Sequence, residues 1–175
     1  MRLLVSLLTL TAVISATASE LPKNLLRYSS GALPMVQNSD AQWVSVNPES
    51  IDWNASYAAV LAGDIGKTLN LTDNSKTFLV DLGQVETINR FSMYTREASG
   101  TLTAYASPVY EDPASGNWTE LGTATFSNNQ IVSFNFNADA RYVMFAFAQT
   151  SNGTIDSMGV FGNLTYSQLR APSNL

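Results

Sequence analysis

The residue types that most often carry catalysis are scarce in this chain. It has no His and no Cys, so the commonest general base, the thiol nucleophile and the commonest metal ligand are all missing. Two carboxylates alone can hydrolyse a glycoside, one as proton donor and one as nucleophile or base. Acids near predicted loops or strand ends are Glu97, Glu111, Asp112 and Glu120. Because scattered surface acids are expected in any acidic protein, the sequence favours binding over catalysis.

Aromatic residues in polar segments are the better candidates for a binding site. Trp43 and Trp53 lie in the polar stretch from Gln42 to Asn54, and Tyr57 and Tyr110 lie in or beside predicted loops. Indole and phenol rings stack on the apolar faces of sugars while their polar tips stay solvated. Trp53 is the first candidate ligand contact. The alternative, in which its indole seals the end of a β-sandwich, stays open.

The N-terminus predicts export. Met1-Arg2 is positively charged, Leu3 to Ile14 is apolar, and Ala16-Thr17-Ala18 fits the small-residue pattern of a signal-peptide cleavage site. The apolar run is shorter than the roughly 20 residues of a spanning helix, and polar Ser19-Glu20 follows it. We therefore predict cleavage after about Ala18 and a secreted, periplasmic or cell-surface protein that is not integral to a membrane.

The composition predicts one acidic domain without disulfides. Without Arg2, eight basic residues face fourteen acidic ones, a formal charge of −6, and no Lys/Arg cluster is present. Nucleic acid is thus not an expected partner, since phosphate binding needs a basic patch. The length suits one domain, predicted over residues 19–169 with a tail at 170–175, and without Cys its stability must come from its core.

Turn-forming residues every eight to twelve positions, with no apolar helical periodicity, predict an all-β fold. Within Arg141–Gln149 both alternating faces are apolar, so this strand is expected to be central. Asn128-Asn129 and Asn137-Ala138-Asp139 predict turns that join three strands in a meander. The expected strands are Thr77–Leu82, Glu86–Thr95, Gly100–Ser107, Trp118–Phe126, Gln130–Phe136, Arg141–Gln149 and Thr154–Phe161.

The N-terminal third is less regular. Tyr57–Leu61 is rich in Ala and fits either one helical turn or a strand. For the helical alternative, Asn54 or Ser56 is the candidate N-cap and Gly63 the candidate residue after the C-cap. Both alternatives remain open at this point.

Phe78-Leu79-Val80-Asp81-Leu82-Gly83 resembles a motif of the discoidin, or coagulation factor 5/8 type C, family of galactose-binding-like domains. Further segments resemble the family in the same order: Ile88 to Tyr94, Ala104 to Ser107 with Trp118 to Leu121, Ala140 to Val143, and Ile155 to Gly162. The resemblance runs from about Gly63 to Gly162. It implies an antiparallel jelly-roll β-sandwich and a role in ligand recognition.

The resemblance also implies roles for individual residues. Asp81, Arg141 and Trp118 would be structural, with Asp81 and Arg141 forming a partly buried pair or capping backbone groups. Arg96 follows a strand at a position where family members often place ligand contacts. The absence of the loop His of many sugar-binding members leaves a galactose-type site in doubt.

A structural calcium ion is a further implication of the resemblance. The turn Gly63 to Thr68 resembles the family's calcium-binding turn, and Asp64 is the candidate ligand. Calcium takes six to eight oxygen ligands, usually with a second acid from the closing strand. That position is Ser157 here, with Asp156 adjacent but on the other face of the strand, so a plain Gly/Asp turn is the alternative.

These observations lead to a non-catalytic, exported module that recognises carbohydrate or another extracellular surface ligand. The main alternative is a structural or assembly protein of the cell envelope or extracellular matrix, which the low charge and polar uncharged surface fit equally well. A carboxylate hydrolase is the third possibility, and it requires two acids in one cleft about 5 to 10 Å apart.

Overall fold

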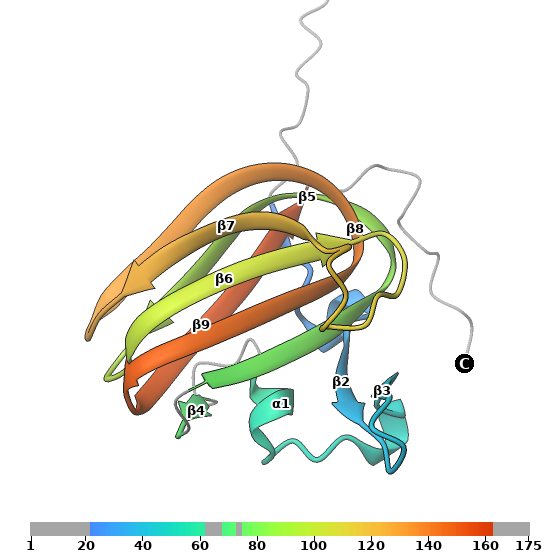
Figure 1. Ribbon diagram of the computed structural model, residues 1–175, viewed down its shortest axis with the longest axis horizontal. Helices are drawn as coiled ribbons and strands as arrows, with labels where there is room; N and C mark the ends of the chain where they lie inside the picture. The colour runs from blue at the N-terminus through green and yellow to red at the C-terminus, as the bar shows by residue number, and fades with distance from the viewer. Residues whose placement is uncertain (1–21, 62–67, 73–74, 163–175) are drawn as a thin grey trace, which may run out of the picture.

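A computed structural model describes residues 22–61, 68–72 and 75–162 of the chain. The predicted signal peptide, Asp64 and the predicted C-terminal tail lie outside these residues. Strands dominate, as predicted (Figure 1). The elements are β1 (Lys23–Asn24), the 3-10 turn η1 (Tyr28–Ser30), β2 (Leu33–Gln37), β3 (Trp43–Ser45), the 3-10 turn η2 (Pro48–Ser50), α1 (Ser56–Ala59), β4 (Leu69–Leu71), β5 (Ser75–Thr95), β6 (Ser99–Ser107), β7 (Thr119–Phe126), β8 (Gln130–Ser151) and β9 (Gly153–Gly162).

The protein is an antiparallel jelly-roll β-sandwich, and two long strands pass through both of its sheets. In the first sheet the order is β3, β2, the first half of β5, the second half of β8, β6 and β7. In the second sheet the first half of β8 pairs with the second half of β5, which pairs with β9. Strands β1 and β4 both pair with β9. Long strands that bend from one sheet into the other form the corners of the sandwich (Figure 1).

Strand β5 changes sheets at Gly83. The pairing of β5 with β8 is regular up to Asp81 and resumes at Glu86, and between them Gly83 has a φ of 85°. A Cβ there would lie 3.0 Å from the carbonyl oxygen of Gly31, so both the backbone angle and the space favour glycine. The Gly83 amide donates to Asp81 Oδ1 at 2.8 Å, which holds the bend.

The predicted strands are present, but two pairs of them are continuous. Thr77–Leu82 and Glu86–Thr95 are the halves of β5, and Gln130–Phe136 and Arg141–Gln149 are parts of β8. The predicted meander is wrong, because β7 pairs with β6 whereas the strand after it crosses to the second sheet and pairs with β5.

The two predicted Asn turns have different outcomes. Asn128-Asn129 is a turn, with Asn129 at a φ of 61°, as expected for Asn in the left-handed region. Asn137-Ala138-Asp139 continues β8 instead of ending it. Asn137 and Asp139 are exposed, whereas Phe136 and Ala138, which alternate with them, are half-buried. These polar residues therefore mark the outer face of a strand and not a turn.

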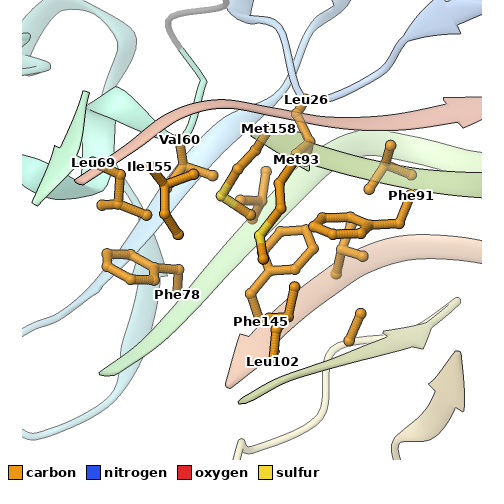
Figure 2. Packing of buried hydrophobic residues seen from close by; sticks show 14 of the residues in the cluster. Leu26, Val60, Leu69, Phe78, Phe91, Met93, Leu102, Phe145, Ile155 and Met158 are labelled. Carbon is orange, nitrogen blue, oxygen red and sulfur yellow. The ribbon is translucent and has the colours of Figure 1, made fainter. Parts of the chain in front are cut away.

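The core lies between the two sheets. The strand predicted to be central, Arg141–Gln149, does pair with β5 on one side and β6 on the other. Phe145 and Leu102 point from the first sheet toward Phe91, Met93 and Met158 of the second (Figure 2). These five residues belong to one buried cluster.

The first residues of Tyr57–Leu61 belong to the helical turn α1, so the helical alternative is the correct one there. Helix α1 has Ala55 at its N-cap, and no side chain caps it, so neither Asn54 nor Ser56 has the predicted role. Ala58 is buried against Val46 and Ile51, with Tyr57 packed beside them. The turn therefore places Tyr57 next to β2.

Candidate functional site

An open pocket forms where β2 diverges from β5. The two strands pair from Leu33 with Asp81 to Met35 with Leu79 and then separate. The pocket has a volume of about 210 Å³. Trp43 of β3 and Tyr57 of α1, two predicted ligand contacts, both line it, together with Met35, Val36, Gln37, Thr77, Phe78, Leu79 and Val80. We call it the Trp43 pocket.

A second open pocket lies beside it on the outer face of the first sheet. It has a volume of about 310 Å³, and its lining includes Thr77, Tyr105, Pro113, Ser115, Gly116, Trp118, Met144 and Ala146. We call it the Trp118 pocket. Thr77 lines both pockets, and Leu79 of the first pairs directly with Met144 of the second. The two pockets are therefore neighbours across the β5–β8 pair, and we call them together the sheet-face groove.

The aromatic rings of the groove are fixed by the elements that carry them. Trp118 Nε1 donates to the carbonyl oxygen of Asp112 at 3.0 Å, which orients the indole under the β6–β7 loop. Tyr57 Oη accepts from the Asp52 amide at 3.3 Å. Trp43 lies within β3, opposite Gln37 of β2. Rings held in this way lose little conformational entropy when a ligand stacks on them.

Among the described residues, none that lines either pocket of the groove is charged. Glu111 borders the lining, where its Oε2 accepts from Ser115 Oγ at 3.3 Å, and Asp81 and Arg141 lie on the strands that carry Leu79 and Met144. Arg141 donates to Asp81 through Nε at 3.0 Å and through Nη2 at 3.1 Å, and Asp81 also accepts from the Gly83 amide and from Ser45 Oγ. Asp81 and Arg141 thus form the predicted pair, and Asp81 is buried within it.

The Asp81–Arg141 pair also affects the pKa of Arg141 itself and of the neighbouring Tyr142. The hydrogen bond to Asp81 raises the pKa of Arg141 above its ordinary value. Burial raises the pKa of Tyr142, which pairs with Asp81 across the strands, and the Asp81 carboxylate raises it further. The guanidinium therefore stays charged and the phenol stays neutral at physiological pH.

Two other predicted contacts lie outside the groove lining. Trp53 is 37% exposed and packs edge-on against Tyr28, with ring centroids 5.4 Å apart. Tyr110, in the loop before β7, is exposed and packs edge-on against Tyr142 at 5.8 Å. Tyr110 thus covers the end of the apolar face that contains Leu79 and Met144, because Tyr142 belongs to the same cluster.

Arg96 lies among a different set of residues, at the end of the sandwich where β5, β8 and β9 have their termini. Its Nη2 contacts Asp156 Oδ2 at 2.7 Å, and its carbonyl oxygen accepts from the Asn129 amide. Tyr94 Oη donates to Asn129 Oδ1 at 2.6 Å. Arg96 lines neither pocket of the groove, so the structure does not bring it together with Trp43 and Tyr57.

The sequence analysis missed several residues of the groove. Trp118 was expected to be structural only, and Met35, Tyr105 and Met144 were not singled out. The available signal was the apolar outer face of Arg141–Gln149. A strand that is apolar on both faces needs a cover on each, and only part of this outer face is covered by Trp43, Tyr105 and Trp118.

The acids suggested for catalysis are not lining residues of the groove, although Glu111 borders it through Ser115 and Glu120 pairs with Tyr105. Glu111 accepts from Ser115 Oγ and Asn117 Nδ2, and Glu120 accepts from Thr123 Oγ1. Among the residues that the structure describes, no three His, Cys, Asp or Glu side chains are arranged to hold a metal ion. In the same part of the chain, no helix has the length and hydropathy needed to span a membrane.

Comparison with known proteins assigns the fold to a family. Residues 62–145 match the family described as NedA-like, galactose-binding domain, of the F5/8 type C kind. The chain has the galactose-binding-like fold. The predicted resemblance is therefore confirmed, and the matched residues include all of β5, β6 and β7 and most of β8. No curated protein sequence matches the chain.

Solved structures of this galactose-binding-like fold are similar over most of the chain. Chitosan-binding module 1 of a Paenibacillus sp. IK-5 chitosanase/glucanase is 17% identical, with a TM-score of 0.54, over 80% of this chain and 99% of the module. CpGH89CBM32-6 of Clostridium perfringens is 14% identical, with a TM-score of 0.53, over 81% of this chain and all of the other. The CBM32 of AlyQ, in complex with 4,5-unsaturated mannuronic acid, is 21% identical, with a TM-score of 0.50, over 69% of this chain and 95% of that one. At these low sequence identities, the similarity shows a shared fold and no more.

Proposed function

We propose that this protein is an exported, non-catalytic carbohydrate-binding module whose ligand contacts the Trp43 pocket. The observation that carries the proposal is the position of Trp43 and Tyr57 beside an open pocket of a galactose-binding-like domain. Aromatic rings with a few polar groups, here Gln37 and Thr77, are the usual elements of a sugar site. Export rests on the signal-peptide pattern from Met1 to Ala18.

The chemistry of the groove supports a non-catalytic role. Glycoside hydrolysis by carboxylates needs two acids on opposite sides of the scissile bond. The lining of both described pockets lacks Asp and Glu. A sugar held there would contact rings, hydroxyls and an amide, which bind it but transfer no proton.

The similar structures support carbohydrate as the ligand class. One of them is named as a chitosan-binding module, and another was solved with an unsaturated mannuronic acid. These names show what those proteins bind, and they make sugars the first ligands to test on this one.

A glycan array followed by calorimetry tests the proposal. Trp43→Ala is expected to lower the affinity for a glycan that the array identifies by about tenfold or more, because a stacked ring is a typical binding hot spot. Trp53→Ala, which removes an equal ring outside the pocket, is expected to change the affinity less than about twofold. An array without binding, or equal losses in both variants, would contradict the proposal.

The oligomeric state distinguishes this proposal from the assembly alternative. A carbohydrate-binding module is expected to remain a monomer in sedimentation analysis at the concentrations used for calorimetry. A stable oligomer that buries Trp43 and that Trp43→Ala dissociates would support assembly instead, since subunit interfaces bury large apolar areas.

A further inference from the structure

We infer that the sheet-face groove takes an extended, uncharged glycan chain that runs across the strands from Trp43 to Trp118. The inference rests on the proposed function and adds the length and charge class of the ligand. It also places the ligand on the outer face of the first sheet and not at the end of the sandwich near Arg96.

The continuity of the two pockets indicates an extended ligand. Thr77 belongs to both linings, and Thr77 pairs with Ala146 of the second pocket, as Leu79 pairs with Met144. The floor is therefore continuous from β5 to β8.

The distance between the two Trp residues exceeds one sugar ring. From β3, which carries Trp43, the sheet continues through β2, β5 and β8 to β6, whose Tyr105 lies beside Trp118. Four strand intervals correspond to about 19 Å, at about 4.8 Å for each interval. A monosaccharide can contact one Trp but not both, whereas an oligosaccharide can contact both at once.

The side chains of the groove match the alternating chemistry of a sugar chain. Met35, Leu79 and Met144 form an apolar floor. Gln37 and Thr77 add an amide and a hydroxyl to the lining, which fit sugar hydroxyl groups as donors and acceptors, and Ser115 Oγ, which donates to Glu111, adds an acceptor. Trp43 and Trp118 offer a ring at either end.

The edge of β5 also contributes to the Trp43 pocket. Strand β2 pairs with β5 only at Asp81, Val80 and Leu79. Within the described residues, Thr77 and Phe78 pair with β8 on one side and line the Trp43 pocket on the other. A sugar in the Trp43 pocket would therefore lie against the side of β5 that β2 leaves at Thr77 and Phe78.

The described residues that line both pockets are all uncharged, which indicates a neutral glycan. An amino sugar or a uronic acid would lose part of its hydration over the apolar floor, and none of the described lining residues carries an opposite charge. The carboxylate of Glu111, which borders the lining, already accepts from Ser115 and Asn117. A neutral chain has no such cost. We therefore assign uncharged polysaccharide chains as the ligand class.

Calorimetry with two matched ligand series tests the inference. One series contains neutral glucose, mannose, galactose and N-acetylglucosamine oligomers from monosaccharide to hexasaccharide, and the other contains glucosamine oligomers of the same lengths. At least one neutral series is expected to gain affinity by about tenfold or more with length, as additional units reach the second pocket. Glucosamine oligomers, which differ from N-acetylglucosamine oligomers only in the charged amine, are expected to bind more weakly at every length.

Two variants assign the gain in affinity to the groove. Trp118→Ala is expected to abolish the gain with length while short oligomers still bind. Because Trp118 also packs against the sheet, Thr77→Glu provides a second test at an exposed position shared by both pockets. It is expected to abolish the binding of long chains, whereas Ser133→Glu, at an exposed position in the second-sheet half of β8, is expected to leave it unchanged.

The possible outcomes separate this inference from the proposed function. If neutral sugars bind but affinity is independent of length and of Trp118 and Thr77, the inference is wrong and the proposed function stands. If glucosamine oligomers bind as tightly as N-acetylglucosamine oligomers, the assignment of a neutral ligand is wrong. If no glycan binds and an extended peptide binds instead, both are wrong.

Discussion

The sheet-face groove and the Arg96 end of the sandwich present opposite kinds of surface. In the groove, the rings of Trp43 and Trp118 lie over an apolar floor, and the lining residues that the structure describes are uncharged. At the Arg96 end, polar side chains already contact one another, with Arg96 on Asp156 and Tyr94 on Asn129. A ligand at the Arg96 end would have to replace these contacts, whereas a ligand in the groove would cover apolar surface that is only half-buried.

The contrast shows that the ligand contacts predicted from the sequence belong to two different regions of the molecule. Arg96 was selected by resemblance to a family position, and Trp43 and Tyr57 were selected because of their ring chemistry. The fold brings Trp43 and Tyr57 together and leaves Arg96 elsewhere. Residue type was therefore a better guide to the groove than the family position.

The largest expected effect is on the free energy of unfolding, when variants of the two ion pairs are compared. Asp81 accepts from Arg141, the Gly83 amide and Ser45, whereas Asp156 contacts Arg96 through one oxygen, and its other oxygen is buried without a partner. Asp81→Asn is expected to lower the free energy of unfolding by about 2 to 4 kcal/mol, because it breaks a buried network. Asp156→Asn is expected to change it by about 1 kcal/mol or less.

Urea denaturation of both variants and of the unmodified protein measures this difference. Circular dichroism of the folded state provides the control that each variant keeps the sandwich. Equal losses at Asp81 and Asp156 would mean that the pair beside the groove stabilises the fold no more than the pair at the other end.

A smaller effect is expected at high pH, and it concerns Tyr142 beside the groove. Its pKa is raised above the ordinary value of 10.0, so the folded state binds the phenol proton more tightly than the unfolded state does. The resulting stability is fully present below about pH 10 and is lost as the pH rises through the raised pKa. Tyr142→Phe is expected to reduce the alkaline decrease in melting temperature.

Thermal unfolding between neutral pH and pH 11 measures this effect. Tyr28→Phe, which removes an exposed phenol, is the matched control and is expected to keep the alkaline decrease of the unmodified protein. The same slope in Tyr142→Phe and in the unmodified protein would show that the phenol at the end of the groove does not contribute to it.

The smallest expected effect is that of salt on binding. Because the described lining residues of the groove are uncharged, the affinity for a neutral glycan is expected to change less than about twofold between low and high ionic strength. Calorimetry in sodium chloride measures this, with potassium chloride as a control for specific ion effects. A steep decrease in affinity with salt would place the ligand among charged residues such as Arg96 and Asp156.

Much of the fold followed from local patterns in the sequence. Alternation within Arg141–Gln149 identified a central strand, because it depends on neighbours in a regular sheet. The Asp81–Arg141 pair was implied by the family resemblance and not by a local pattern. Asn137 and Asp139 misled the prediction of a turn. Alternation of exposed polar and half-buried apolar residues continues through them, and this longer pattern was the more reliable signal.

The groove could be predicted only in part. Ring chemistry pointed to Trp43 and Tyr57, but the groove itself depends on the separation of β2 from β5 after Met35 and on the loop that orients Trp118. Both features arise from tertiary structure, and no local pattern in the sequence indicates them. Trp53 has the same ring chemistry as Trp43 and a similar polar setting, and only the packing against Tyr28 distinguishes it.

The most direct test of the sheet-face groove is an NMR titration of the isotope-labelled protein with a glycan identified on the array. We predict that the largest chemical-shift changes occur at the indole N–H groups of Trp43 and Trp118 and at the Thr77 amide, and that the amides of Arg96 and Asn129 change little. Large changes confined to Arg96, Asn129 and their neighbours would contradict this account and place the ligand at the end of the sandwich.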